Sequence, residues 1–433
     1  MKLPGIIMIV TVLAQACSAV CEPDQFPAIY PDYIGVTVPE GLAPLRFRMA
    51  DGSRCSVRTR RDADTVWYEV KAAGVRYREF PVYVSHDEID PFVAYRLIEP
   101  GYESWHDIAI CQRELSSWKE RDIVTNRVND LGCVNCHTFQ NGDPDRMFFH
   151  ARGKGGGTVF VGGEGVSKVN FAEIGPQRQG TYPAPHPSGR YVAFSSNTTR
   201  QSFTIGSTQP IEVYDTESDI ILYDIQTGAA TLPEQLSGPG QMETFPAWNS
   251  EGDRLYYCAA DSISNVSRNR GKVHYRLMSI AFEDGAFVGE PQTVWEDPQA
   301  SASFPRVNGK WLLFTRSGYG TFPIWHKEAD LWLMDLESGE CRPAEELNSE
   351  DTESYHSWSS NGRWLVFSSR RGDGRYTRLY FSHFDGEGLF SKPFLLPQRR
   401  PELNALRLKS YNIPEFVRGQ VPDRQKEIKR LFE

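Results

Sequence analysis

The chain has 433 residues, with 47 Lys and Arg against 56 Asp and Glu, which gives a formal net charge of −9 at pH 7. This acidic balance argues against a protein that binds nucleic acid non-specifically. Hydrophobic residues make up 40% and aromatic residues 12% of the chain. Such a composition excludes a disordered chain and favours β structure, whose pleated faces accommodate flat side chains.

The first segment is typical of an export signal. Met1-Lys2 is a short basic start, Leu3 to Ala14 is almost wholly apolar, and Ala14-Gln15-Ala16 has the pattern of a cleavage site. Because the apolar run is too short to span a bilayer, residues 1–16 predict a secretory signal peptide. Cys17 stands where a bacterial lipoprotein carries its lipidated cysteine. We therefore expect a location in the periplasm or at the outer membrane, with membrane contact only through this lipid anchor.

Short apolar segments without a repeat follow the signal. Residues 24–90 predict a small β-sandwich-like domain, with strands around Ile34 to Val38 and Thr65 to Val70. Residues 91–125 predict further strands that could complete a first or a closing blade of the repeat described below.

Cys133-Val134-Asn135-Cys136-His137 is a C-x-x-C-H motif, which is the attachment site of a c-type haem. The two thiols form thioethers with the haem vinyl groups, and the histidine that follows ligates the iron. A local disulfide or half of a zinc site is the alternative, but apart from Cys17 and Cys21 at the export signal the other cysteines are isolated. Chance accounts for roughly 0.003 such motifs in a chain of this composition. The motif therefore predicts covalent haem c held by Cys133 and Cys136, with His137 as the proximal iron ligand.

Four similar segments repeat along the C-terminal two thirds of the chain. Each begins with Thr or Ser followed by an aromatic residue, and an apolar run follows its glycine. The glycines lie 63, 57 and 53 positions apart, at Gly189, Gly252, Gly309 and Gly362. A unit of four short strands repeating at this interval is typical of a β-propeller blade, and a sandwich with coincidental turns is the alternative.

A degenerate fifth copy of the repeat contains the haem motif, because residues 145–149 match residues 253–257. Counting back without a gap places His137 opposite Phe245 and Cys136 opposite Thr244. Since the innermost strands of a propeller line its channel, we expect the haem at one mouth of the channel among aromatic residues. These are Tyr182, Phe245, Phe304 and Tyr355.

The second axial ligand of the iron would be a histidine or a methionine. His356 replaces the proline of the other repeats next to the predicted channel, so it is the candidate distal iron ligand. A hydrogen-bonded structural histidine is the alternative reading of this residue. Packing or a solvated loop explains Met242 and His326 better than ligation does.

The remaining cysteines and the absent motifs limit other functions. Four cysteines allow three disulfide pairings, among which the sequence does not choose: Cys55, Cys111, Cys258 and Cys341. The sequence contains no nucleophile elbow, phosphate-binding glycine loop or HExxH motif. It therefore favours an electron carrier or a binding protein over a hydrolase.

Phe245-Pro-Ala-Trp-Asn-Ser-Glu-Gly and Tyr355-His-Ser-Trp-Ser-Ser-Asn-Gly resemble the repeats of the TolB-like (WD40-like) propeller family. The resemblance covers about residues 137–397 and implies a propeller of about six blades in a periplasmic setting. With Gly132-Cys-Val-Asn-Cys-His-Thr-Phe ahead of the repeats, the chain looks like a bacterial group of TolB-like, cytochrome c-related proteins. TolB itself carries no haem motif, so its partners are not carried over.

The sequence thus predicts an all-β protein with a propeller over 91–397 and a C-terminal tail, 398–433, that ends in a short helix. We expect an exported haem protein that exchanges single electrons with a redox partner or another envelope protein. The alternative is an envelope scaffold that binds a protein or glycan and has no redox role. No nucleic-acid partner is expected.

Overall fold

The structure is a computed structural model that describes residues 25–99, 106–153, 155–163, 165–174, 179–204, 209 and 211–433. The predicted signal peptide, 1–16, and the candidate lipidation site Cys17 lie outside these residues. Within them, no helix is long and apolar enough to cross a membrane. The α-helices are short: α1 (Phe171–Ile174), α2 (Val266–Asn269), α3 (Leu403–Leu406) and α4 (Gln425–Arg430). Short 3-10 helices are η2 (Asn126–Asn129), η3 (Gln140–Gly142), η4 (Glu234–Leu236), η5 (Arg270–Lys272) and η6 (Pro323–Trp325).

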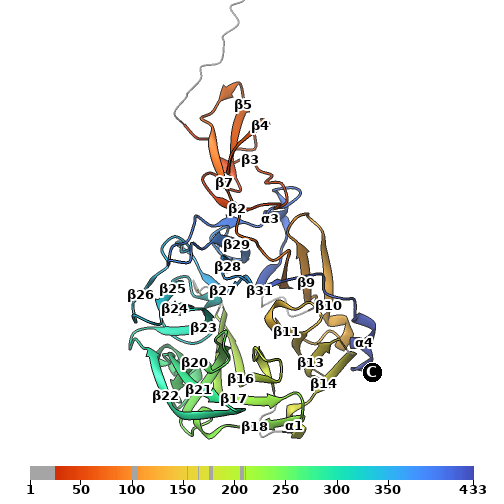
Figure 1. Cartoon of the computed structure of the whole chain (residues 1–433), viewed down its shortest axis with the longest axis vertical. Helices are drawn as coiled ribbons and strands as arrows, with labels where there is room; N and C mark the ends of the chain where they lie inside the picture. Colours follow the sequence, from red (N-terminus) through yellow and green to blue (C-terminus); the bar gives the residue numbers. More distant parts are fainter. Residues whose placement is uncertain are drawn as a thin grey trace, which may run out of the picture.

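Six four-stranded antiparallel sheets surround a central axis, as Figure 1 shows. In five of them the innermost strand comes first in the chain and the other three follow outward. The first of these sheets consists of β11 (Val134–Phe139), β12 (Met147–Ala151), β13 (Gly157–Gly162) and β14 (Gly165–Val169). The second consists of β15 (Thr181–Pro185), β16 (Tyr191–Phe203), β17 (Ile211–Asp224) and β18 (Ala229–Thr231).

The other three sheets of this kind follow in chain order around the axis. They are β19 (Gln241–Trp248), β20 (Arg254–Asp261), β21 (Arg276–Glu283), β22 (Ala286–Trp295); β23 (Ser301–Asn308), β24 (Trp311–Ser317), β25 (Asp330–Asp335), β26 (Cys341–Pro343); and β27 (Glu353–Trp358), β28 (Trp364–Ser369), β29 (Arg378–His383), β30 (Phe394–Leu395). The predicted β-propeller is confirmed by this arrangement of sheets, which is typical of the fold.

The sixth sheet joins the two ends of the propeller. Its strands from the axis outward are β31 (Ser410–Val417), β8 (Phe92–Ile98), β9 (Ala109–Glu114) and β10 (Glu120–Thr125). The segment 398–433, predicted to be a tail, therefore supplies an innermost strand besides its short helix α4. The repeat search missed β31 because Ile413 stands where four of the other innermost strands carry an aromatic residue.

The region before the propeller consists of a five-stranded and a two-stranded sheet. The larger contains β2 (Thr37–Pro39), β7 (Phe80–Ser85), β5 (Thr65–Ala72), β4 (Cys55–Asp62) and β6 (Val75–Arg76), and the smaller contains β1 (Ile29–Tyr30) and β3 (Arg48–Met49). Buried residues of this region, such as Phe80, belong to one hydrophobic cluster with Tyr95 of β8 and Trp364 of β28. Because this core is shared, the region packs directly against the propeller.

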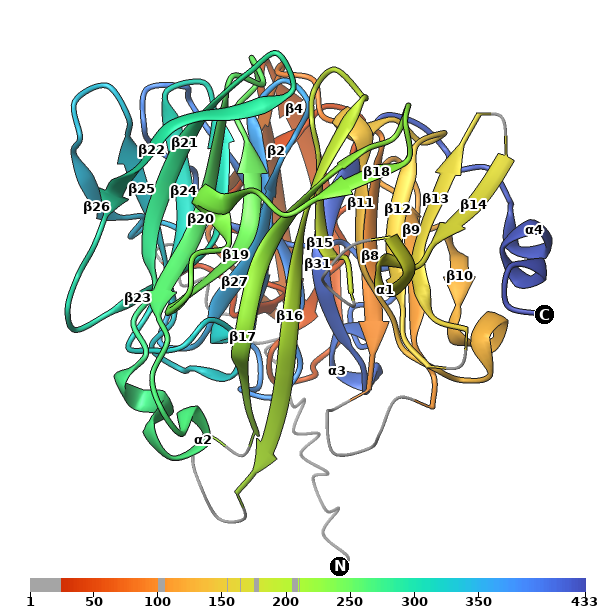
Figure 2. The ribbon, with the colours of Figure 1, turned by 90° about the horizontal axis from the view of Figure 1, so that it is seen from below.

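A group of charges around the buried His326 ties the long hairpin of β16 and β17 to the loop of η6. Figure 2 shows these two strands extending past the rest of the ring beside α2. Glu212 Oε2 of β17 lies 3.8 Å from His326 Nε2, and the Tyr319 hydroxyl donates to Glu212 Oε1 at 2.6 Å. His326 Nδ1 lies 3.2 Å from Glu328 Oε1.

The two carboxylates determine the charge of His326. Burial alone would lower the pKa of His326, but its contacts with Glu212 and Glu328 raise that pKa to about 9. In return, His326 lowers the pKa of Glu328 to about 2. His326 is therefore a buried cation with a structural role, in agreement with the expectation that it packs and does not ligate.

This cluster predicts that the free energy of unfolding falls on the alkaline side. Because the folded pKa of His326 lies above its ordinary value of 6.5, its stabilisation is complete below pH 6.5 and is lost as the pH rises through about 9. The stabilisation from Glu328 is present above pH 4.5 and is lost only as the pH falls towards 2. Urea unfolding at several pH values measures this dependence. His326→Gln should flatten the decline above pH 6.5, and an unchanged decline in this variant would contradict the assignment.

Candidate functional site

One bulge recurs on all six innermost strands and decides which side chains reach the central channel. At each bulge the pairing with the next strand shifts register, and the first bulged residue adopts a left-handed conformation with φ between 46° and 54°. The bulged pairs are Cys136-His137, Tyr182-Pro183, Phe245-Pro246, Phe304-Pro305, Tyr355-His356 and Ile413-Pro414. The six pairs are structurally equivalent.

This equivalence corrects the predicted register of the haem motif by one residue. Cys136, not His137, is the counterpart of Phe245, and His137 occupies the proline position. The cause is the connection to the second strand. Seven residues, 140–146, separate the paired residues Phe139 and Met147, whereas six separate the equivalent pair in the β19 sheet. An ungapped count could not detect this insertion.

Four aromatic bulge residues fill the channel together with Phe322. The ring centroids of Tyr182 and Phe245 are 4.6 Å apart, those of Phe245 and Phe304 are 4.1 Å apart, and those of Phe304 and Tyr355 are 4.8 Å apart. We call these five residues the aromatic plug. Two adjacent strands, β11 and β31, contribute no ring to it, since they carry Cys136 and Ile413 at this level. The predicted ring of aromatic residues around the channel is present, with a gap on the side of the haem motif.

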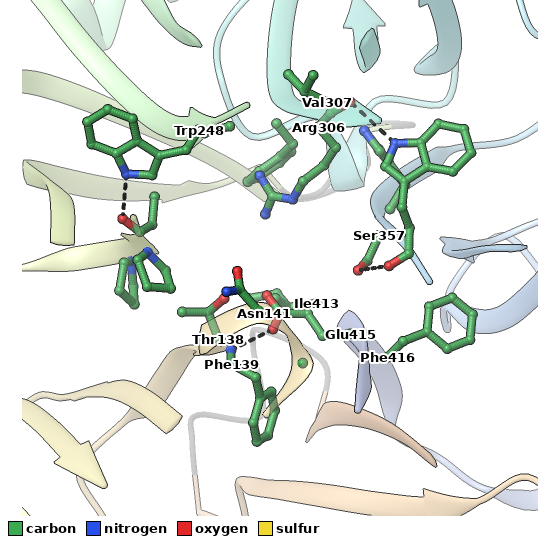
Figure 3. A pocket seen from close by; sticks show the side chains of 18 of the residues that line it. Thr138, Phe139, Asn141, Trp248, Arg306, Val307, Ser357, Ile413, Glu415 and Phe416 are labelled. Atoms are coloured by element: carbon green, nitrogen blue, oxygen red, sulfur yellow. Dashed lines mark hydrogen bonds between the residues drawn. The ribbon is translucent and has the colours of Figure 1, made fainter. Parts of the chain in front are cut away.

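A cavity of about 510 Å³ lies beside the plug, where the innermost strands end. Residues from all six innermost strands line it, and its volume lies within the ~300–1,000 Å³ range of small-molecule sites. Two of its walls are indole rings that hydrogen bonds hold in place. Trp248 Nε1 donates to the carbonyl of Ala184 at 3.0 Å, and Trp358 Nε1 donates to that of Arg306 at 3.3 Å (Figure 3).

His137 lines this cavity with an imidazole that has no hydrogen-bond partner among the described residues. Its side chain is buried, and neither ring nitrogen forms a hydrogen bond with any residue that the structure describes. Burial, helped by the charge of Arg96, lowers the pKa of His137 to about 3. The ring is therefore neutral at physiological pH and has a free lone pair, which is the form that binds a metal ion.

The two cysteines of the motif occupy different surroundings. Cys136 lines the cavity next to His137, whereas Cys133 belongs to a hydrophobic cluster with Ile110 and Val134. Burial raises the pKa of both thiols, that of Cys136 to about 11, and the neighbouring Cys133 contributes to the latter shift. Both sulfurs are therefore protonated, which argues against a thiolate nucleophile. Cys136 and His137 fit a haem in this cavity, and Cys133 lies close behind them with its side chain turned into the cluster.

His356, the candidate distal ligand, lines the same cavity at the position equivalent to His137. Its Nε2 lies 3.0 Å from the carbonyl oxygen of Leu313 in the neighbouring sheet, and its buried Nδ1 has no partner among the described residues. Burial lowers the pKa of His356 to about 3. A distal role stays a prediction. Met242 is fully buried in the hydrophobic cluster around the plug and does not line the cavity, as expected for a packing residue.

Four charged residues line the cavity, and none of them was singled out from the sequence: Asp90, Arg306, Glu415 and Arg418. Arg306 and Glu415 enter it from opposite sides (Figure 3), each two residues after the left-handed bulge residue. Arg306 stands where two repeats carry Ala184 and Ala247, and this exchange of a small residue for a charged one was a usable signal. Burial raises the pKa of Glu415 to about 7, against the opposing effects of Arg306 and of hydrogen bonds such as that from Phe139 N at 3.0 Å.

The described residues form neither a disulfide nor a cluster of metal-binding side chains elsewhere. The six cysteines among them, including Cys55, Cys111, Cys258 and Cys341, are free thiols, so no predicted pairing is formed. Within the same residues, no group of three His, Cys, Asp or Glu side chains could hold a metal ion.

Comparison with known proteins yields likenesses to solved structures alone. Neither a scan with protein-family models nor a search of curated proteins found a match. TolB from Acinetobacter baumannii is 11% identical, over 83% of this chain and 82% of that chain, with a TM-score of 0.46. An oligogalacturonate lyase in complex with manganese is 12% identical over 79% and 73%, with a TM-score of 0.40. The periplasmic gluconolactonase PpgL of Pseudomonas aeruginosa is 14% identical over 75% and 99%, with a TM-score of 0.39.

The unpartnered imidazole of His137 predicts that this residue lowers the stability of the haem-free protein. A buried polar group without a hydrogen bond costs about 1–3 kcal/mol, so His137→Leu should raise the free energy of unfolding by about this amount. His356→Leu is the matched control at the equivalent position. It removes the contact with Leu313 together with one unpartnered nitrogen, so the two effects oppose each other and the free energy of unfolding should change by less than about 1 kcal/mol. Urea unfolding of both variants measures the difference, and a loss of stability in His137→Leu would contradict the prediction.

Proposed function

We propose that this protein is an exported electron carrier of the bacterial cell envelope that binds haem c in the cavity next to the aromatic plug. The observation that carries the proposal is the buried His137 ring, which has two unpartnered nitrogens and lies beside Cys136 at the cavity. Such an imidazole is costly for a protein unless a ligand uses it. The C-x-x-C-H spacing names the ligand as covalent haem.

The residues of the chain have separate roles in this proposal. The thiols of Cys136 and Cys133 each add across a vinyl group: a C–S bond forms at the carbon next to the ring, the thiol hydrogen goes to the terminal carbon, and nothing is oxidised or reduced overall. His137 would supply a neutral nitrogen to the iron, and His356 is the candidate second ligand. The bound group supplies one-electron exchange at the iron. The plug and the two tryptophans keep water away from it.

Export and anchoring complete the proposal. Residues 1–16 direct secretion, and Cys17 would tether the protein to a membrane. Thioether bonds would keep the haem in its own protein, so only electrons would be exchanged. They would pass to or from a redox partner protein in the same compartment.

A second candidate function is an envelope scaffold that binds a protein or glycan in the cavity without a redox role. The position of Cys133 in the hydrophobic cluster favours this alternative, since that thiol does not line the cavity. Tryptophan walls and the opposed Arg306 and Glu415 also suit a polar ligand.

Protein made in a host with c-type maturation machinery separates the two functions. We expect a covalently retained haem that denaturing electrophoresis and mass spectrometry detect. Cys136→Ala should lose at least 90% of this retention, because Cys136 is the thiol at the cavity. Cys133→Ala should retain haem through one thioether, with the visible bands of the reduced pyridine complex shifted towards those of haem with an unreacted vinyl group.

Cys341→Ala is the control, since its thiol is half-buried in an outer strand away from the cavity, and it should retain haem fully. If the native protein folds but shows no haem absorption, the electron-transfer proposal is wrong and the scaffold function remains.

The distal ligand has its own test in His356→Ala. If His356 completes the coordination, the absorption spectrum of the oxidised protein should change from a low-spin to a high-spin form in this variant. His150→Ala is the control, because His150 is buried in the β11 sheet and pairs with Thr158 at 3.2 Å. An unchanged spectrum in His356→Ala would restrict His356 to its structural contact with Leu313.

A further inference from the structure

Arg306 lies on the wall of the cavity opposite the haem motif. The innermost strands contact one another in the order β11, β15, β19, β23, β27 and β31, and β31 returns to β11. In this ring β23 is the third strand from β11 in either direction. Arg306 of β23 therefore faces the strand that carries Cys136 and His137 across the full width of the channel, and Figure 3 shows its guanidinium directed into the cavity.

The guanidinium of Arg306 has donors to spare. Its hydrogen bond to the described part of the protein runs from Nη1 to the carbonyl of its neighbour Pro305 at 2.9 Å. No carboxylate of the described residues lies within ion-pair distance of it. A guanidinium has five N–H donors, so most of those of Arg306 have no acceptor in the part of the chain that the structure describes. Burial lowers the pKa of Arg306, but it remains charged, because arginine does not deprotonate in proteins.

Glu415 attracts this charge electrostatically but forms no ion pair with it among the described residues. Its carboxylate accepts the backbone N–H of Phe139 at 3.0 Å, which holds it towards the β11 side of the cavity. Burial also raises the pKa of Glu415, which disfavours the ionised carboxylate and weakens its attraction for Arg306. Arg306 is thus a cation opposite the haem motif that has no ion pair among the described residues, and an anionic group of a ligand would supply one.

We propose that Arg306 binds a propionate carboxylate of the haem, an inference that rests on the proposed function. In haem the two propionates leave the macrocycle on the edge opposite the two vinyl groups. If the vinyl edge is joined to Cys136 on β11, the propionate edge faces β23. The guanidinium fork binds a carboxylate through two parallel hydrogen bonds, and Arg306 has the free donors for this contact. Arg306 then fixes the orientation of the macrocycle in the channel.

The test uses metal-free protoporphyrin IX and its dimethyl ester, which lacks the two carboxylates, with haem-free protein of the full mature chain. Fluorescence titration measures the dissociation constant of each porphyrin. We expect the native protein to bind the diacid at least 10-fold more tightly than the ester. Arg306→Met should lose about 10-fold in affinity for the diacid and leave the affinity for the ester unchanged. Arg306→Lys should recover part of the loss, because it retains the charge without the fork.

Lys310→Met is the matched control, since it removes one positive charge from the same hairpin, where Lys310 pairs with Asp335 outside the cavity. It should bind both porphyrins as the native protein does, and circular dichroism verifies that each variant folds. Equal affinity for diacid and ester in the native protein, with no effect of Arg306→Met, overturns the role of Arg306 and leaves haem binding intact. Failure of the native protein to bind either porphyrin, together with absence of covalent haem after maturation, overturns the proposed function itself.

Discussion

The channel of this propeller depends on one backbone constraint, the left-handed residue that opens the bulge of every innermost strand. Non-glycine residues in this conformation cost on the order of 1–2 kcal/mol each, and the chain adopts it six times. The extra residue of the bulge interrupts the alternation of side chains along the strand. Packing offsets the strain, because the bulge turns aromatic rings such as Phe245 and Phe304 into contact across the axis. Wherever the bulge falls, the residues at and after it reach the channel.

The same constraint makes the haem motif unusual among the six strands. At the level of the plug β11 alone carries a thiol in place of a ring, and at the next position an imidazole replaces proline, as His356 also does on β27. The apolar surroundings keep Cys136 protonated and His137 neutral, since burial disfavours the charged form of each. A chain selected for stability alone would place an aromatic residue and a proline here, as three of its repeats do. The departure from the repeat is thus a departure from the packing that stabilises the other strands, which is the pattern expected at a functional site.

Sequence patterns and structure agree where the physics is local. Glycines such as Gly252, with φ of 78°, predict hairpin turns because few other residues adopt this conformation, and the strands on either side follow. The apolar runs after these glycines become buried second strands, which their local pattern of apolar residues also predicts. By contrast, the register of Cys136 and His137 depended on one inserted residue between β11 and β12. An ungapped alignment cannot detect such an insertion. Strand β31 was missed because Ile413-Pro414 lacks the aromatic signal and lies after the last recognisable repeat.

The sequence by itself determined the repeat, the all-β propeller and the set of residues from which a haem site could be built, because turn chemistry, apolar periodicity and the C-x-x-C-H spacing are local properties of the chain. Tertiary structure alone decided which members of that set meet. It placed Cys136 and His137 at the cavity and Cys133 in a cluster behind it, and it brought Arg306 from 169 positions further along the chain to the wall opposite His137. Closure of the ring creates that relation, since strands become opposite one another only when β31 pairs with β8.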